Sequence, residues 1–252
     1  MSLFYLKIIA MAAMLFDHAD KAFGLRAILA QSLAGSSGTL SYQVLFVILG
    51  LIGRVSAPIF FFGIANGYVH TRSRNRYFMR LAAFAALSQI PYTLFYGINV
   101  YNTDGALAKA NLNILFSLAL GILALSFYDR LKEKSLFAAV ISVLCLGGLA
   151  IVLRTDYTFG ALLFILYFYL SSSLSHKGKA AAGALTVLAA NLLNLFSPET
   201  LWSTLFITLP GQYLGVLAVL FHNGKKGRSI KYAFYLFYPL HLLAIWLIRT
   251  VL

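Results

Sequence analysis

The chain has 252 residues, of which 61% are hydrophobic and only 11% are charged. Soluble domains carry about 25% charged residues, so this composition excludes an ordinary soluble protein and predicts an integral membrane protein. The single cysteine, Cys145, excludes an intrachain disulfide and any metal site with two cysteine ligands.

Apolar stretches long enough to cross a hydrocarbon core of about 30 Å recur along the whole chain. We predict an all-α polytopic membrane protein with one transmembrane domain, residues 1–252, and about nine membrane-spanning helices. In chain order, these helices are expected at residues 4–24, 43–69, 77–96, 111–127, 135–153, 158–174, 180–196, 201–221 and 232–252. The segment between the first two, 25–42, is rich in glycine and serine and is expected to be a flexible loop.

Basic residues alternate between two sets of connections. The richer set comprises Arg72, Arg74, Arg76, Arg80, Arg130, Lys132, Lys134, Lys177, Lys179, Lys225, Lys226, Arg228 and Lys231, and the poorer set comprises Lys21, Arg26, Lys109, Arg154 and Arg249. By the positive-inside rule the richer set is cytoplasmic, which predicts a cytoplasmic N-terminus and an external C-terminus. Most of the net charge of +13 follows from this pattern, and no nucleic-acid partner is needed to explain it.

The first helix carries Lys7 and His18, which are eleven residues apart. Eleven residues make about three helical turns, so the two side chains share one face and lie roughly 16 Å apart along the axis. An ionisable group within a membrane costs about 2.5–3.5 kcal/mol on insertion scales and usually faces a cavity or a partner. The spacing therefore predicts a cavity along this face, while Lys7 alone is also compatible with snorkelling to the headgroups.

A second basic residue, Arg54, lies near the middle of the second helix, close to Pro58. It either lines the same cavity or neutralises Asp17 in a structural ion pair. Asp17 precedes His18 but lies about 100° away around the helix, so the spacing does not require the two to touch. With the predicted topology, the residues of the outer half include His18, Asn113, Asp156, Asn194 and His241. Lys7 and Arg54 then form a basic path below them, which suits an anionic donor entering from the cytoplasm.

Several motifs occur in order along nearly the whole chain. They are Lys7-x10-His18, Gly53-Arg54-Val55-Ser56-Ala57-Pro58 with Asn66-Gly67-Tyr68, Arg80 to Tyr92 with Ser88-Gln89-Ile90-Pro91, Asn113-Ile114-Leu115-Phe116, Asp156-Tyr157, Asn223-Gly224-Lys225-Lys226-Gly227, and Phe234 to His241 with Tyr238-Pro239. This ordered set resembles the TraX family, whose best-known member is a conjugative pilin acetylase, and more distantly the acyltransferase-three group of membrane acyltransferases. One departure is Thr158, since a glycine is usual in the family directly after the tyrosine.

The resemblance implies a metal-independent acyltransferase of the bacterial cytoplasmic membrane that moves acetyl from cytoplasmic acetyl-CoA to an acceptor at the outer half. A pilin N-terminus, a cell-surface sugar and a small molecule are all open as acceptors. His18 is expected to act as general base or as a nucleophile forming an acyl-imidazole. The other expected roles are catalysis for Asp17, Arg54 and Asn113, CoA binding for Lys7, Arg54, Arg72, Arg76 and Arg80, and acceptor binding for Asp156, Tyr157, Tyr238 and His241.

Two other functions stay open at this point. In a transporter or channel, Lys7, Arg54 and His18 would line a substrate or proton path. In a non-enzymatic partner of a secretion or conjugation apparatus, the same residues would be structural. A transferase consumes acetyl-CoA, a transporter moves solute across sealed vesicles without consuming it, and a scaffold does neither.

Overall fold

The computed structural model describes residues 1–35, 38–96, 111–228 and 231–251. These ranges contain helices and connections but no strand, and their one isolated β-bridge joins Leu112 to Thr155. The helices are α1 (Leu3–Phe23), α2 (Leu25–Ala34), α3 (Thr39–His70), α4 (Arg74–Tyr96), α5 (Ile114–Leu131), α6 (Leu136–Val152), α7 (Thr158–Leu170), the 3-10 turn η1 (Ser171–Ser173), α8 (His176–Ala190), α9 (Leu192–Leu195), α10 (Pro198–Ser203), the π-helical turn η2 (Thr204–Thr208), α11 (Leu209–Leu220) and α12 (Lys231–Val251).

Each of the nine segments predicted from the sequence coincides with one of these helices or with a short run of them. The predicted all-α class is confirmed for the described residues. Four segments are long and apolar enough to cross a membrane, by length and composition: Thr39–His70, Ile114–Leu131, Pro198–Leu220 and Tyr232–Val251. The chain is therefore a helical membrane protein.

The expected loop at 25–42 is wrong for most of its length. Residues 25–34 form α2, and α3 begins at Thr39. Ala30 and Ala34 are buried, and the Arg26 guanidinium lies 4.0 Å from the centre of the Phe46 ring on α3. Packing on α3 thus stabilises a helix in this short segment. The neighbouring glycines and serines had favoured a loop instead.

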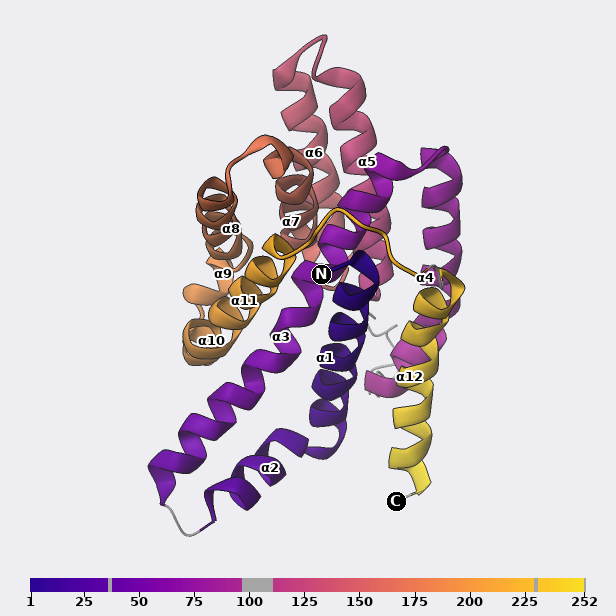
Figure 1. Ribbon diagram of the computed structural model, residues 1–252. Coiled ribbons are helices and arrows are strands. Elements are labelled where there is room, and N and C mark those ends of the chain that lie inside the picture. Colours follow the sequence, from indigo (N-terminus) through magenta and orange to yellow (C-terminus); the bar gives the residue numbers. More distant parts are fainter. Residues whose placement is uncertain (36–37, 97–110, 229–230, 252) are drawn as a thin grey trace.

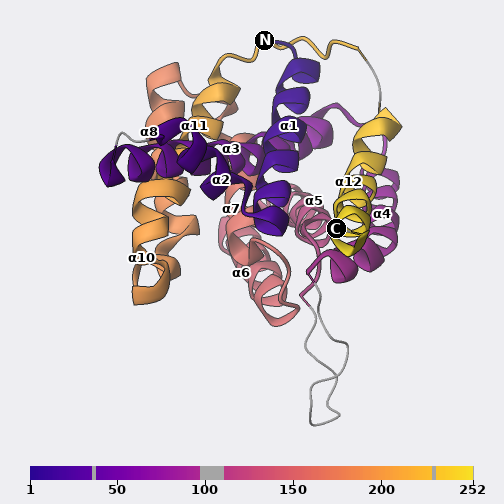
Figure 2. The same cartoon turned by 90° about the horizontal axis from the view of Figure 1, so that it is seen from below.

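The long helix α3 crosses the molecule and packs against α1, α2, α7 and α11 (Figures 1 and 2). Its contact with α11 is close because α11 has glycines there. A Cβ at Gly211 would lie 2.6 Å from the Arg54 Cβ, and one at Gly215 would lie 2.6 Å from the Val55 carbonyl oxygen. Small residues let membrane helices approach in this way, so α3 and α11 hold each other by backbone proximity.

On the other side of α3, helix α12 runs beside α4 and also contacts α1 (Figures 1 and 2). Three of these four helices contain an internal proline: Pro58 in α3, Pro91 in α4 and Pro239 in α12. Proline has no amide hydrogen, so each leaves the carbonyl four residues earlier without its helical partner. Helices α1, α3, α4 and α12 surround the site described below.

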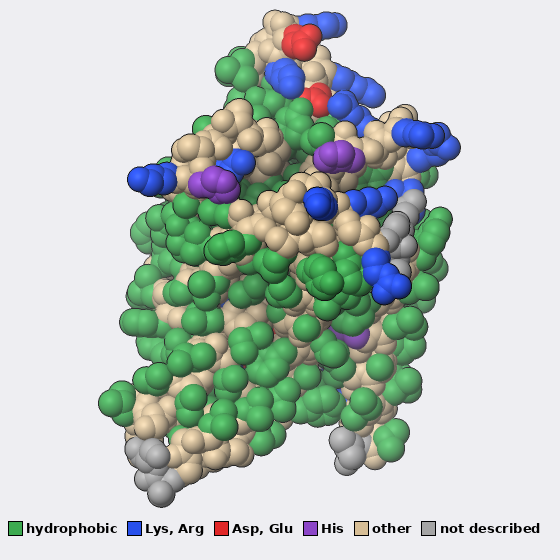
Figure 3. All heavy atoms as spheres, viewed as in Figure 1, with side chains coloured by type: hydrophobic (Ala, Val, Ile, Leu, Met, Phe, Trp, Pro, Cys, Tyr) green, Lys and Arg blue, Asp and Glu red, His purple; other side chains and the backbone are tan. Residues whose placement is uncertain are grey.

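Lys and Arg side chains gather at one end of the molecule, above a broad hydrophobic belt (Figure 3). A cluster around Asp129 holds the connections together at this end. Its carboxylate accepts hydrogen bonds from Tyr68 (3.0 Å), Tyr169 (2.5 Å) and Lys132 (2.8 Å), and the Arg74 guanidinium lies 3.1 Å away. The cluster joins α3, α4, α5 and α7, so the connections at 71–73 and 132–135 lie at the same end of the molecule. In the poorer set, Lys109 lies outside the described residues.

Candidate functional site

Lys7 and His18 both face α12, as their spacing on one face of α1 predicts. The Lys7 ammonium lies 4.8 Å from the centre of the Phe234 ring, and His18 Nδ1 lies 3.1 Å from His241 Nε2. Phe234 and His241 are seven residues apart, which is two helical turns. The face of α1 that carries the ionisable residues is therefore matched by one face of α12.

The hydrogen bonds of the two histidines define their tautomers. Nδ1 of His18 lies 3.0 Å from the Met14 carbonyl oxygen, and Nδ1 of His241 lies 2.7 Å from that of Phe237. A carbonyl only accepts, so each Nδ1 carries a hydrogen. The His18 Nδ1–H also points at His241 Nε2, which accepts. Among the described residues this assignment leaves the unprotonated Nε2 of His18 without a hydrogen-bond donor, in a ring that is buried and meets the edge of Phe95.

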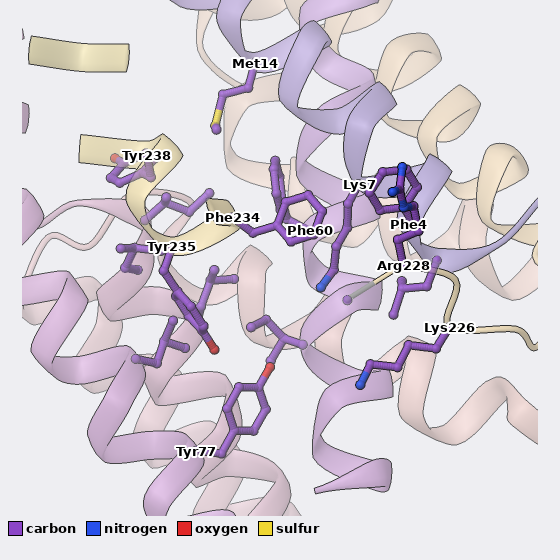
Figure 4. A pocket seen from close by; sticks show the side chains of 17 residues that line it. Phe4, Lys7, Met14, Phe60, Tyr77, Lys226, Arg228, Phe234, Tyr235 and Tyr238 are labelled. Carbon is purple, nitrogen blue, oxygen red and sulfur yellow. The ribbon is translucent and has the colours of Figure 1, made fainter. Parts of the chain in front are cut away.

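A cavity of about 200 Å³ opens between α1, α3, α4, α5 and α12 (Figure 4). Three cations line it: Lys7 from α1, and Lys226 and Arg228 from the α11–α12 connection. No carboxylate lines it, and none of the three cations makes an ion pair within the described part of the chain. The other walls are aromatic and aliphatic, including Phe234 and Tyr77. Such a cavity is suited to an anionic group with an apolar extension.

The α11–α12 connection is held in place by the start of the chain. The amides of Leu3 and Phe4 donate to the carbonyls of Lys225 (2.9 Å) and Lys226 (3.2 Å). Gly227 has a φ of +71°, and a Cβ there would lie 2.6 Å from the Ser2 hydroxyl oxygen. Only glycine fits that close approach without strain. This pairing fixes the loop that carries Lys226 and Arg228.

The cavity ends near the histidine pair and does not include it. Met14 and Tyr238 line the cavity, and they precede His18 and His241 by about one helical turn each. Neither His18 nor Arg54 is among the lining residues. The expectation that Lys7, His18 and Arg54 share one continuous cavity is therefore wrong for this structure.

Arg54 lies on the α3 side of α1 and pairs with Asp17. Its Nη2 is 3.6 Å from one Asp17 oxygen, and Lys21 Nζ is 2.7 Å from the other. A Cβ at Gly53 would lie 2.6 Å from the Asp17 carboxylate, so the glycine makes room for it. Asp17 thus faces away from the His241 partner of His18. The ion-pair interpretation of Arg54 applies, while its Nε is buried without a hydrogen-bond partner in the described residues.

The turn between α6 and α7 places Asp156 and Tyr157 near Asp17, Lys21 and Arg54. Tyr157 hydrogen-bonds Arg54 and packs its ring against Phe61. Burial raises the pKa of the Asp156 carboxyl, against the opposing influence of Lys21. The backbone is strained here, because φ is +50° at Arg154, +61° at Tyr157 and +39° at Thr158. Strain of this kind is concentrated at functional sites.

Asn113 has a structural position at the start of α5. Its Oδ1 accepts from the Leu115 amide (3.0 Å), and its Nδ2 donates to the Ala85 carbonyl (2.8 Å) and to Gln89 Oε1 (2.9 Å). Both amide hydrogens are therefore used, and the side chain is fully buried. This arrangement leaves Asn113 no donor for an oxyanion. Gln89, which had no predicted role, also accepts from the Asn113 backbone amide (3.1 Å).

The remaining predicted residues fall into two groups. Arg80 Nε lies 3.4 Å from the Tyr235 hydroxyl, beside the cavity, whereas Arg72 and Arg76 are exposed and do not line it. Tyr238 is buried between the cavity and His241, with its ring centre 5.8 Å from that of the imidazole. Lys226 and Arg228 were not predicted as binding residues. The Asn223–Gly227 motif, on which part of the family resemblance rests, includes Lys226 and directly precedes Arg228, but the sequence alone did not show what this loop contacts.

Comparisons with known proteins agree with these motifs. A family model described as "TraX protein" matches residues 2–249. A curated protein of Dichelobacter nodosus, "Probable fimbrial assembly protein FimC, serogroup H1", is 30% identical over 250 residues, which cover 96% of this chain and 93% of that protein. No solved structure matches the chain. The chain belongs to the TraX family.

Proposed function

We propose that this protein is a membrane-embedded acyltransferase that transfers acetyl from cytoplasmic acetyl-CoA to an acceptor at the outer half of the membrane. One observation carries the proposal. A cavity lined by Lys7, Lys226 and Arg228, without a carboxylate, ends one helical turn from a buried histidine pair. Uncompensated cations near a membrane interior favour an anionic ligand.

The cavity residues fit the chemistry of the proposed donor. Its phosphates suit charge-assisted hydrogen bonds from Lys7, Lys226 and Arg228, with Arg80 nearby. Arg72 and Arg76 are exposed and do not line the cavity, so we assign them to the mouth of the site. A volume of about 200 Å³ is suited to a narrow thioester arm, so the nucleotide would stay outside, at the basic end of the molecule. When bound, acetyl-CoA supplies the activated acetyl group.

The histidine pair provides a base of defined orientation. His18 Nε2 takes the proton of the acceptor hydroxyl or amine, and the resulting positive ring keeps its Nδ1–H on Met14 and His241. His241 is a positioning residue that holds the tautomer. Asp17 and Arg54 fix α1 against α3, and Asp156, Tyr157 and Tyr238 are assigned to the acceptor side.

A binding experiment tests this proposal directly. Lys7→Ala should weaken acetyl-CoA binding to the purified protein by about tenfold, the loss expected for one charge-assisted contact of about 1.5 kcal/mol. Lys7→Arg should keep most of the affinity because it keeps the charge. Release of the CoA thiol from acetyl-CoA by the wild type is the accompanying activity. Unchanged binding in Lys7→Ala, with no thiol release by the wild type, would contradict the proposal.

The fimbrial assembly named for the relative supports a second candidate, an assembly partner without catalysis. Such a protein would bind its pilus partner equally well with or without His18 and would release no thiol. A transporter with Lys7, Arg54 and His18 on its path is the other alternative. The separation of Arg54 from the cavity disfavours it.

We further propose that all nine predicted segments cross the bacterial cytoplasmic membrane, with the N-terminus in the cytoplasm. The clustering of basic connections at one end supports this orientation. The test starts from Cys145→Ser, which removes the only cysteine. Lys225→Cys should then resist a membrane-impermeant maleimide in intact cells, whereas Thr250→Cys should react. The reverse result would invert the topology.

A further inference from the structure

A second cavity, of about 660 Å³, lies on a different face of α3 from the first. Phe60, Gly63 and Ile64 of α3 line the first cavity, while Phe62, Asn66 and His70 belong to the second. Helices α7, α8 and α11 complete the second cavity at the basic end of the molecule. The α11–α12 connection contributes to both, with His222 on this side and Lys226 on the other.

The charged lining of the second cavity is entirely basic. It contains Lys132, Lys179 and three histidines, at positions 70, 176 and 222, and no carboxylate. Asp129 already compensates Lys132 through their 2.8 Å contact. The Lys179 ammonium makes neither an ion pair nor a hydrogen bond among the described residues. One full positive charge is therefore left facing the cavity.

Two of the histidines present a free nitrogen. Nδ1 of His70 lies 2.8 Å from the Asn66 carbonyl oxygen, and Nδ1 of His222 lies 3.2 Å from that of Met1. Both Nδ1 atoms thus carry hydrogens, so each Nε2 can donate to an anion only when its ring is protonated. Burial lowers the pKa of the His222 imidazole, and the nearby N-terminal ammonium and His70 lower it further. A bound anion would counter these effects and favour the protonated rings, whose Nε2–H groups then donate to it.

We propose that this cavity binds a phosphate group, with Lys179 as its main cation and the protonated rings of His70 and His222 as hydrogen-bond donors. The lining also has an apolar part that includes Phe62, Phe168 and Leu220. A phosphate ester with an apolar remainder, such as an anionic phospholipid, matches both parts. A soluble phosphate is the other source of the same chemistry.

Helix α8 offers a matched pair of variants for the test. Lys179 lines the cavity, whereas Lys177, two residues earlier, is exposed and does not. Lys179→Gln and Lys177→Gln remove the same charge from the same helix. The purified full chain is titrated in detergent with phosphatidylglycerol, with phosphatidylcholine and with inorganic pyrophosphate, and bound probe is counted by native mass spectrometry.

The wild type and Lys177→Gln should bind phosphatidylglycerol more tightly than phosphatidylcholine, and Lys179→Gln should lose about tenfold in affinity for it. Pyrophosphate binding with the same dependence on Lys179 would support the phosphate site and assign it to a soluble ligand. Equal losses in the two variants would mean that the charged surface attracts lipid without a site. That result, or equal affinity for the two lipids together with no binding of pyrophosphate, would overturn the proposal.

Discussion

His18 and His241 are 223 positions apart in the chain, yet their rings are joined by a contact of 3.1 Å between Nδ1 and Nε2. This contact ties α1 to α12. The backbone carbonyls of Met14 and Phe237 hold both rings in the same tautomer. The consequence is an asymmetric pair, in which His18 keeps a free basic nitrogen and His241 accepts.

His18→Ala should reduce acetyl-CoA turnover by about 100-fold or more, since a positioned general base contributes about 10²–10⁴-fold. His241→Ala should cost less, because the Met14 carbonyl still holds the His18 Nδ1–H. Thiol release by each purified variant measures the effect, with size-exclusion elution as the folding control. Turnover above a tenth of wild type in well-folded His18→Ala would remove His18 from the chemistry.

Lys226→Ala should weaken acetyl-CoA binding by about tenfold, whereas Lys225→Ala should leave it nearly unchanged. The two lysines are neighbours in one loop, but only Lys226 lines the cavity (Figure 4). A charge-assisted contact is stronger than the attraction of an exposed charge. Titration with acetyl-CoA measures both dissociation constants. If both variants lost the same affinity, only the overall charge of the loop would matter.

Gly53→Ala should destabilise the protein by about 1–3 kcal/mol, the usual cost of overpacking. The new methyl group would lie 2.6 Å from the Asp17 carboxylate and would displace it from Lys21 and Arg54. Gly148→Ala in α6 is the matched control, since nothing lies within 4 Å of its Cβ position. Thermal unfolding in detergent should show a lower midpoint for the first variant only.

Thr158→Gly should not lower the unfolding midpoint, although glycine usually weakens a helix. Thr158 has a φ of +39°, which a β-branched residue adopts only under strain. Glycine relieves that strain, at an entropic cost of about 0.5–1 kcal/mol. Thr186→Gly, within α8, lacks this compensation and should be destabilising. A lower midpoint in Thr158→Gly than in Thr186→Gly would contradict the strained-turn interpretation.

The helical segments were predictable from the sequence because each contains an apolar run, and four of them reach the length needed to cross a membrane. The shared face of Lys7 and His18 was also predictable, since it depends only on helical geometry. Helix α2 was missed because its ten residues are too few to give a membrane-length signal. Its order comes from the surface of α3, which no local pattern encodes.

The composition of the site was less predictable, because it depends on how helices are rotated about their axes. Lys7 lies on the face of α1 that meets Phe234 of α12, whereas Arg54 of α3 meets Asp17 on another face of α1. Asn113 was expected to be catalytic, whereas its position before α5 gives it a capping role of a kind that asparagine often has. Lys226 enters the cavity through pairing with Leu3 and Phe4, a contact between distant parts of the chain.

Pro239 divides α12 between the two parts of the site. Phe234, Tyr235 and Tyr238 precede it and line the cavity, and His241 follows it. The missing hydrogen bond to the Tyr235 carbonyl makes this junction the easiest place for α12 to bend. A bend there would move the cavity wall together with Phe237, whose carbonyl holds Nδ1 of His241 from the other side of the proline. The same junction in α12 thus couples admission of a ligand to the alignment of the two imidazoles.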